Sequence, residues 1–344
     1  MDQPLRVINS TAPIRVCDNG GWTDTWFAGH GRVLNMAVQP LVEVRIQVFP
    51  QAGRAERVVI DARNFGDRYA PALDGPGWGR HPLLEATIWR MGVPDGVALE
   101  VSIFSQAPSG ASTGTSAAVA VALIGALDCL TEGRLAPPEV AALAHSVEVV
   151  ILKQQSGIQD QICSAYGGIN HIEISRYPQA IVAQVPLSDE MFKNLDRRLA
   201  LIYLGRAHSS SQVHDKVIKE LADAGPDCKR LEDLRLAAAE ARDALCAGDL
   251  QALGQAMIAN TEAQGRLHPD LVCADARRVI DIAREHGALG WKVNGAGGEG
   301  GSLTLLCGPL SAARRAMIRD IEQENARFQS IPIRLSRHGL RTWG

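Results

Sequence analysis

The N-terminal half of the chain alternates short apolar runs with polar or glycine-rich turns. Apolar residues recur at every second position in 42–49, which predicts a strand, and 33–38 is expected to pair with it as a hairpin. Shorter apolar runs predict further strands, and longer runs predict helices. The expected strands are 5–8, 14–16, 58–60, 97–104, 169–174 and 180–185, and the expected helices are 82–91, 116–130 and 137–153.

The C-terminal half is richer in helical patterns. After an expected strand at 199–203, glycine and proline breaks separate four expected helices, at 210–223, 228–247, 249–264 and 270–286. The chain then closes with expected strands at 290–293 and 302–307, a helix at 309–327 and a strand near 331–335. The change of pattern near 185–195 predicts an α+β protein with two domains, 1–190 and 191–344.

Composition is that of an ordinary globular protein, with 344 residues, 46% hydrophobic residues and a formal net charge of -3. This charge gives no electrostatic reason to expect nucleic acid or an anionic membrane as a partner. The most apolar run, 117–127, is too short to cross a bilayer, and the first residues lack the apolar core of a secretion signal. The seven cysteines show no metal-binding spacing. We therefore expect reduced thiols and a cytoplasmic location.

The most informative stretch is 108–118, which is made of small residues and hydroxyls between an expected strand and an expected helix. A glycine-bearing loop that leads into a helix N-terminus gathers backbone N–H groups around an anion, and hydroxyls can hold phosphate or a hard cation. Tight packing before a buried helix is the alternative interpretation. The residues expected to hold a polyphosphate are Pro108, Gly110, Ala111, Ser112, Thr113, Gly114, Thr115 and Ser116.

Two other nucleotide-binding motifs are excluded by the residues themselves. A Walker loop requires a lysine, and none occurs between Val97 and Leu152. The segment 295–300 formally matches GxGxxG, but an expected strand follows it where a dinucleotide-binding fold requires a helix.

Several charged residues could act on a ligand of this loop. Asp160, between two glutamines, could be a general base for a hydroxyl nucleophile, or it could cap a helix. Glu148 could reach a metal at the loop, or be a partly exposed helical acid. Arg15 and Asp24 flank a glycine turn, where the arginine suits a phosphate or carboxylate and the aspartate suits a polyol. Trp22 in the same turn is consistent with sugar recognition.

Three segments in a fixed order resemble the signature motifs of the GHMP kinases, a superfamily that includes galactokinase, homoserine kinase, mevalonate kinase and phosphomevalonate kinase. They are 12–24 (APIRVCDNGGWTD), 108–118 (PSGASTGTSAA) and 292–301 (KVNGAGGEGG), so the resemblance spans nearly the whole chain. Within the superfamily, GGWTD is similar to the first motif of the L-fucokinases. The segment 159–170 (QDQICSAYGGIN) resembles the D-glycero-D-manno-heptose 7-phosphate kinases. Both enzymes phosphorylate the anomeric C1 hydroxyl of a sugar.

The resemblance implies a GHMP kinase fold. It would have an N-terminal ribosomal-protein-S5-domain-2-like domain that binds ATP, at 1–190, and a C-terminal ferredoxin-like α+β domain with extra helices, at 191–344. The implied enzyme uses ATP and Mg²⁺ and phosphorylates the C1 hydroxyl of a small-molecule sugar or sugar phosphate, as a monomer or homodimer.

The resemblance also implies a role for individual residues. Asp160 would be the catalytic aspartate, and Arg15 would pair with it or with the transferring phosphoryl group. Thr115 and Ser116 would contact Mg²⁺ and the phosphates, with Glu148 as the metal carboxylate. The residues expected at the substrate are Asp24, Trp22, Thr23, Gly167, Gly168, Gly295 and Gly297.

Three positions depart from the family pattern. Ser112 replaces a glycine in the phosphate loop, Asn19 stands where many relatives carry a small apolar residue, and Glu299 adds a negative charge to the third motif. Two alternatives remain open from the sequence. One is a family member that acts on a non-sugar alcohol such as homoserine or mevalonate, and the other is a non-catalytic protein that senses sugar and nucleotide.

Overall fold

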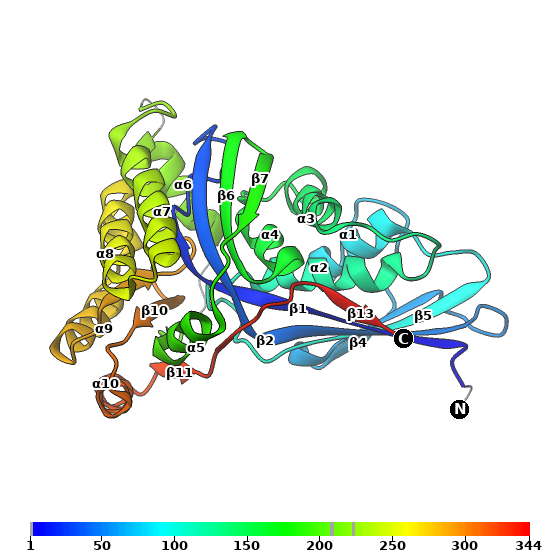
Figure 1. Ribbon diagram of the computed structural model, residues 1–344. Coiled ribbons are helices and arrows are strands. Elements are labelled where there is room, and N and C mark those ends of the chain that lie inside the picture. The colour runs from blue at the N-terminus through cyan, green and yellow to red at the C-terminus, as the bar shows by residue number, and fades with distance from the viewer. Residues whose placement is uncertain (1–2, 207–209, 222–223) are drawn as a thin grey trace.

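The computed structural model describes residues 3–206, 210–221 and 224–344. Within these residues the strands form two sheets (Figure 1). In the nine-stranded sheet the order is β13-β1-β2-β5-β3-β4, and β2 also pairs with β6 and β12, while β7 pairs with β6. In the four-stranded sheet the order is β11-β8-β10-β9. The α+β class predicted from the sequence is confirmed.

The large sheet is organised around two long antiparallel strands, β1 (Arg6–Asn19) and β2 (Gly31–Pro50). The predicted hairpin of 33–38 with 42–49 is wrong, because both runs belong to β2. Gln39 and Pro40 bulge out of the ladder with β1 at the point where the hairpin turn was expected. A proline has no N–H to donate to a ladder, and the bulge allows the strand to continue past it.

The other strands of this sheet come from both ends of the chain. The predicted pair near 169–185 is confirmed as the antiparallel strands β6 and β7. The C-terminal segment returns to the sheet, where β12 pairs with β2 and β13 pairs with β1. The bounds are β3 (Val58–Ala62), β4 (Asp67–Tyr69), β5 (Val97–Ser105), β6 (Ile169–Arg176), β7 (Gln179–Gln184), β12 (Arg334–Leu335) and β13 (Arg341–Trp343).

Helices α1 (Pro82–Met91), α2 (Thr115–Asp128), α3 (Pro137–Ser146) and α4 (Gln159–Tyr166) lie together on one side of the large sheet (Figure 1). Helix α2 is apolar on all sides, and it packs against β1, β2 and the other three helices. The predicted helix over 137–153 is formed by α3 and a π-helical turn at Val147–Ile151 that continues it directly. The short, polar helix α4 was not predicted.

The second sheet contains β8 (Leu199–Tyr203), β9 (Gly290–Val293), β10 (Ser302–Leu306) and β11 (Gln329–Ile331). The four helices predicted over 210–286 are confirmed, although residues 222–223 of the first lie outside the described residues. Helix α5 was not predicted. The bounds are α5 (Asp189–Arg198), α6 (Ser210–Leu221), α7 (Lys229–Ala247), α8 (Leu250–Leu267), α9 (Ala274–Glu285) and α10 (Ser311–Glu324).

The two parts of the chain are joined by helix packing, since α7 packs against α8 and β2, and α8 packs against β9. This packing brings the end of β1, the loop before α2 and the loop between β9 and β10 together. The division at residue 190 falls within α5 and stays a prediction. Within the described segments, none of the helices combines the length and the apolar character that crossing a bilayer requires.

Candidate active site

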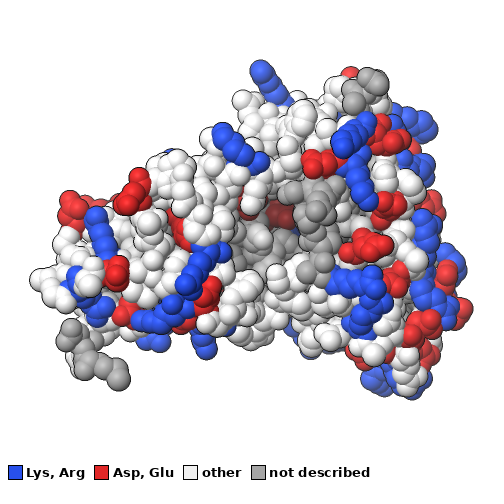
Figure 2. Space-filling view, turned by 180° about the vertical axis from the view of Figure 1, so that it is seen from behind, with Lys and Arg blue, Asp and Glu red and all other residues white. Residues whose placement is uncertain are grey.

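A cavity of about 220 Å³ opens where the loop before α2, the turn after β1 and the loop after β9 meet. Figure 2 shows it as a hollow in one face of the molecule, with acidic atoms visible at its floor. The sequence segments predicted to form one site therefore lie together. The predicted residues in its lining are Arg15, Trp22, Asp24, Gly110, Ala111, Ser112, Thr113, Gly114, Thr115, Ser116, Glu148, Asp160 and Gly295.

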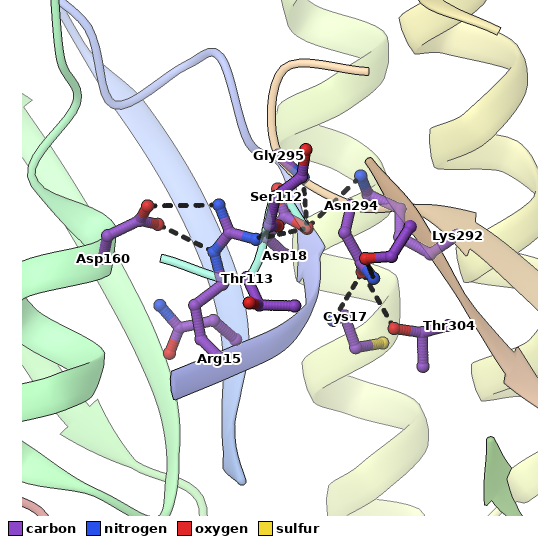
Figure 3. Close-up of polar contacts among 12 residues, drawn as sticks. Arg15, Cys17, Asp18, Ser112, Thr113, Asp160, Lys292, Asn294, Gly295 and Thr304 are labelled. Carbon is purple, nitrogen blue, oxygen red and sulfur yellow. Dashed lines mark hydrogen bonds and ion pairs between the residues drawn. The ribbon is translucent and has the colours of Figure 1, made fainter. Parts of the chain in front are cut away.

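Arg15 and Asp160 form a bidentate pair in this lining (Figure 3). The Arg15 Nε atom lies 2.8 Å from Asp160 Oδ1, and Nη2 lies 3.1 Å from Oδ2. Arg15 Nη1 also donates to the carbonyl oxygen of Ser112. Burial alone would lower the pKa of Arg15, but the neighbouring carboxylates of Asp160 and Asp18 outweigh it and raise the pKa. Arg15 is therefore a fixed cation that joins β1, the loop and α4.

The loop before α2 lies directly against this pair. Gly114 has a left-handed backbone with φ of 68°, and a Cβ atom placed on it would lie 3.1 Å from the Asp160 carboxyl carbon. Thr115, Ser116 and Ala117 begin α2 and line the cavity, and the first N–H groups of a helix have no acceptor within the helix. The loop therefore presents donors beside the Asp160 carboxylate, as an anion site requires.

Ser112 stands where the family pattern has glycine, and its φ of 57° lies in the left-handed region. An L-residue with a Cβ is disfavoured there, whereas glycine is not. We expect Ser112→Gly to raise the free energy of unfolding by about 0.5–1 kcal/mol, after the greater freedom of glycine in the unfolded chain is subtracted. Thermal unfolding measures this change. The same substitution at Ser164, inside α4, should destabilise the protein, and equal effects at both positions would contradict the backbone argument.

A second cavity of about 500 Å³ adjoins the first across the same loop. Gly110, Thr115, Ser116 and Gln154 line both cavities. The second cavity lies beside α1 and β5, and Pro108 lines this one. Its apolar and aromatic lining includes Phe65, Leu83, Leu84, Ile103, Pro108 and Val119.

Two buried carboxyl groups of the first cavity have raised pKa values. Burial raises the pKa of Glu148 to about 7, and the nearby charge of Asp160 adds to this. Glu148 Oε2 accepts hydrogen bonds from Ser156 and Gln161, while Oε1 is buried without a donor among the described residues. Burial raises the pKa of Asp24 to about 6, although its carboxylate accepts the Gln159 backbone N–H at 3.1 Å. The unsatisfied oxygen of Glu148 fits a cation ligand.

Four residues predicted at the substrate lie outside the lining of this cavity. The Thr23 hydroxyl donates to the carbonyl oxygen of Gly20 at 2.7 Å, within its own turn. The Gly168 N–H donates to the Ser336 carbonyl oxygen, and Gly167 packs closely against the backbone at 338–339. Gly297 packs against the backbone of Leu271. These glycines allow close approach of backbone segments.

Glu299, the departure in the third motif, points away from the cavity. Its side chain is 83% exposed and lies 3.6 Å from Arg206 Nη1 in an ion pair. The additional negative charge is therefore solvated at the surface, and it does not line the cavity.

Sequence reasoning missed a buried ion pair behind Arg15. Asp18, which was expected in a loop, is the fully buried penultimate residue of β1, and Lys292 Nζ lies 3.6 Å from its Oδ1 atom. The Gly295 N–H contacts both Asp18 oxygens, at 3.0 and 3.1 Å (Figure 3). The signal available in the sequence was Lys292 itself, because a lysine inside an apolar strand is costly to bury without a partner.

His214 was also missed, because it lies on α6, far along the chain from the motifs. It lines the cavity, and its ring centroid lies 4.6 Å from that of Trp22. Trp22 is only 5% exposed and His214 is half-buried, and the two rings together form one wall of the cavity. The single histidine in a polar helix gave no distinguishing signal in the sequence.

The fold and this cavity define the class of protein. The model for the GHMP kinases N terminal domain matches residues 83–168, and the model for the GHMP kinases C terminal domain matches residues 241–320. A mevalonate kinase of Thermococcus sibiricus is 32% identical over 251 residues, which cover 70% of this chain and 68% of that protein. The chain belongs to the GHMP kinases, a family that uses ATP.

Two further similarities concern sugar kinases. The bifunctional fucokinase/GDP-fucose pyrophosphorylase of Arabidopsis thaliana is 28% identical over 338 residues, which are 92% of this chain but only 31% of that larger protein. The crystal structure of a D-glycero-D-manno-heptose 1-phosphate kinase from Bacteroides thetaiotaomicron aligns with a TM-score of 0.74 at 19% identity, covering 98% of this chain and 99% of that one. This alignment shows that the two chains share a fold.

Proposed function

We propose that this protein transfers the γ-phosphoryl group of ATP to the anomeric C1 hydroxyl of a sugar. One observation carries the proposal. The Asp160 carboxylate, held by Arg15, lies against Gly114 of the phosphate loop and lines the same cavity as Asp24 and Trp22. A carboxylate that can orient a hydroxyl thus lies between a phosphate site and a wall suited to a polyol.

The two adjoining cavities suggest how ATP binds. The apolar second cavity suits the adenine and ribose, and residues 110–116 lead from it to the first cavity. The triphosphate would follow this loop, with its negative charge near the N-terminus of α2. The γ-phosphoryl group then reaches the cavity that contains Asp160.

Phosphoryl transfer has a loose transition state, so the protein mainly positions the reactants and neutralises charge. In this proposal Asp160 accepts the proton of the attacking hydroxyl as the new P–O bond forms, or holds that hydroxyl in line. An anomeric hydroxyl is more acidic than an ordinary alcohol, so a weak base suffices. Arg15 holds Asp160 in place through two hydrogen bonds. Ser116 and Glu148 would hold Mg²⁺, which supplies charge neutralisation on the phosphates.

The charges of the cavity favour an uncharged acceptor. Asp24 and Glu148 line it and form no ion pair among the described residues, whereas Arg15 and Lys292 balance the charges of Asp160 and Asp18. Sugar hydroxyls can donate to carboxylates, whereas the carboxylate of mevalonate or the phosphate of a sugar phosphate would be repelled by them. The similarity to a fucokinase agrees with a sugar, and the similarity to a mevalonate kinase makes mevalonate the second candidate.

An acceptor panel tests the proposal. Neutral sugars including L-fucose, sugar phosphates including a heptose 7-phosphate, mevalonate and homoserine would be tested for ADP release with Mg·ATP. Thermal shifts with a non-hydrolysable ATP analogue would report binding without turnover. We expect turnover with a neutral sugar and a product without reducing power, because C1 is blocked. Turnover of mevalonate alone, or a product that still reduces, would contradict the proposal. Binding of sugar without ADP release would favour a sensing protein.

We expect Glu148→Gln to raise the Mg²⁺ concentration needed for half-maximal turnover by about tenfold, because an anionic ligand is replaced by a neutral one. In the wild type this requirement should fall as the pH rises through about 7, since the proton that competes with the metal leaves the Glu148 carboxyl group. The variant should lose this pH dependence. Mg²⁺ titrations at pH 6 and pH 8 measure both effects, and identical titrations for the two proteins would remove Glu148 from the metal site.

A further inference from the structure

Behind the cavity, a lysine is buried at the boundary between the two sheets. Lys292 on β9 is 1% exposed, and its ammonium group donates to Gln264 Oε1 at 3.0 Å and to the carbonyl oxygen of Val293. Asp18 on β1 is equally buried, 3.6 Å from the same ammonium group. Burying two charges costs more than an apolar pair would, so stability alone is a weak reason for such a pair.

The position of Asp18 suggests what the lysine does. Arg15 lies between two carboxylates, with Asp160 at 2.8 and 3.1 Å and Asp18 Oδ1 at 4.0 Å from Nη1. On its other side, Asp18 forms an ion pair with the Lys292 ammonium group and accepts a hydrogen bond from the N–H of Gly295 (Figure 3). If Lys292 lost its charge, Arg15 would be the remaining cation beside Asp18 among the residues that the structure describes, and its guanidinium would be drawn towards Asp18.

We propose that Lys292 is a positioning residue, which neutralises Asp18 so that Arg15 remains bonded to Asp160. The inference rests on the proposed kinase reaction, in which Asp160 acts on the acceptor hydroxyl. It also assigns a role to the segment 292–301, the third of the family motifs. Lys292 and Gly295 belong to β9 and the loop after it, whereas Arg15 and Asp18 belong to β1. Residues of the four-stranded sheet therefore act through Asp18 and Arg15, in the nine-stranded sheet, to position Asp160.

The test compares Lys292→Met, Asp18→Asn and the double variant. Lys292→Met keeps the length of the side chain but removes the charge, and we expect kcat to fall about 100-fold because Arg15 is displaced from Asp160. The KM for ATP should change less than about threefold, since the phosphate loop and second cavity keep their residues. Adding Asp18→Asn to Lys292→Met should raise kcat again, to within about tenfold of the wild type, because the competing carboxylate is gone.

Lys229→Met is the matched control, because Lys229 forms an exposed ion pair with Asp233 on α7. Its kcat should equal that of the wild type. The proposal is overturned if Lys292→Met keeps wild-type kcat, or if the double variant is no more active than Lys292→Met. If Lys292→Met does not fold, the double variant is compared with Asp18→Asn. A kcat of the double variant more than about tenfold below that of Asp18→Asn also overturns the proposal. Absence of turnover in the wild type with every acceptor would instead refute the proposed function.

Discussion

Replacing Asp160 with asparagine is expected to lower kcat by about 1,000-fold or more, which is the range for loss of a positioned general base. Asparagine has the shape of aspartate, but it cannot accept the proton of the acceptor hydroxyl. It also leaves the Arg15 guanidinium without its bidentate carboxylate partner. The KM for ATP should change little, because the second cavity and the loop from Gly110 to Ser116 are untouched. A coupled ADP assay measures turnover, and calorimetry with an ATP analogue measures nucleotide binding.

Asp95→Asn provides the control for this substitution. Asp95 is fully exposed, in an ion pair with Arg57, so removal of its charge should leave both kcat and nucleotide binding unchanged. Turnover of Asp160→Asn close to that of the wild type would rule out the proposed role of Asp160. Parallel loss of turnover and of ATP binding would indicate a collapsed site, in place of a lost base.

The parts of the fold that were predicted correctly are those whose local pattern is strong. Helices α7 and α8 are long and rich in alanine and leucine, which favour helix, and glycine or proline marks their ends. The loop before α2 was visible because its small residues are contiguous and precede a helix that is apolar throughout. In such segments the local sequence and the tertiary environment favour the same structure.

The parts that were missed depend on partners distant in the chain. Strand β13 has only three residues and exists because it pairs with β1. The sequence of β2 predicts two strands because Pro40 interrupts its alternating pattern. In the structure β1, β5 and β6 pair along the length of β2 and keep it continuous. Short helices such as α4 are marginal by themselves and are stabilised by packing, here against α2 and β1.

In the candidate site too, some residues could be predicted from local motifs and others depend on partners distant in the chain. Arg15 and Asp160 could be proposed because each lies in a recognisable motif, and the structure brings them within hydrogen-bond distance. The pairing of Asp18 with Lys292 could not be proposed, because neither residue indicates its partner and the two strands belong to different sheets. The glycines at 167 and 168 show another limit of the sequence, since close backbone packing and ligand contact both favour glycine.

Replacing Arg15 with methionine should lower kcat by about 1,000-fold, which is comparable to loss of the general base itself, because Asp160 loses the partner that holds it in place. Three interactions disappear together, namely the two hydrogen bonds to Asp160 and the one to the Ser112 carbonyl oxygen. Asp160 would then be free to turn away from the phosphate loop, to which Arg15 now ties it. Steady-state kinetics with the acceptor found in the panel measure the loss, and thermal unfolding shows whether the variant is folded.

Arg15→Lys separates the charge of Arg15 from its geometry. Lysine keeps the positive charge, but its single ammonium group cannot reproduce the planar fork that holds both Asp160 oxygens. If orientation of Asp160 is the main contribution, the lysine variant should be nearly as slow as the methionine variant. The control is Arg278→Lys, at an exposed ion pair with Glu324, which should have no effect. A lysine variant with wild-type kcat would show that Arg15 contributes charge alone, and the positioning argument for Lys292 would then lose its basis as well.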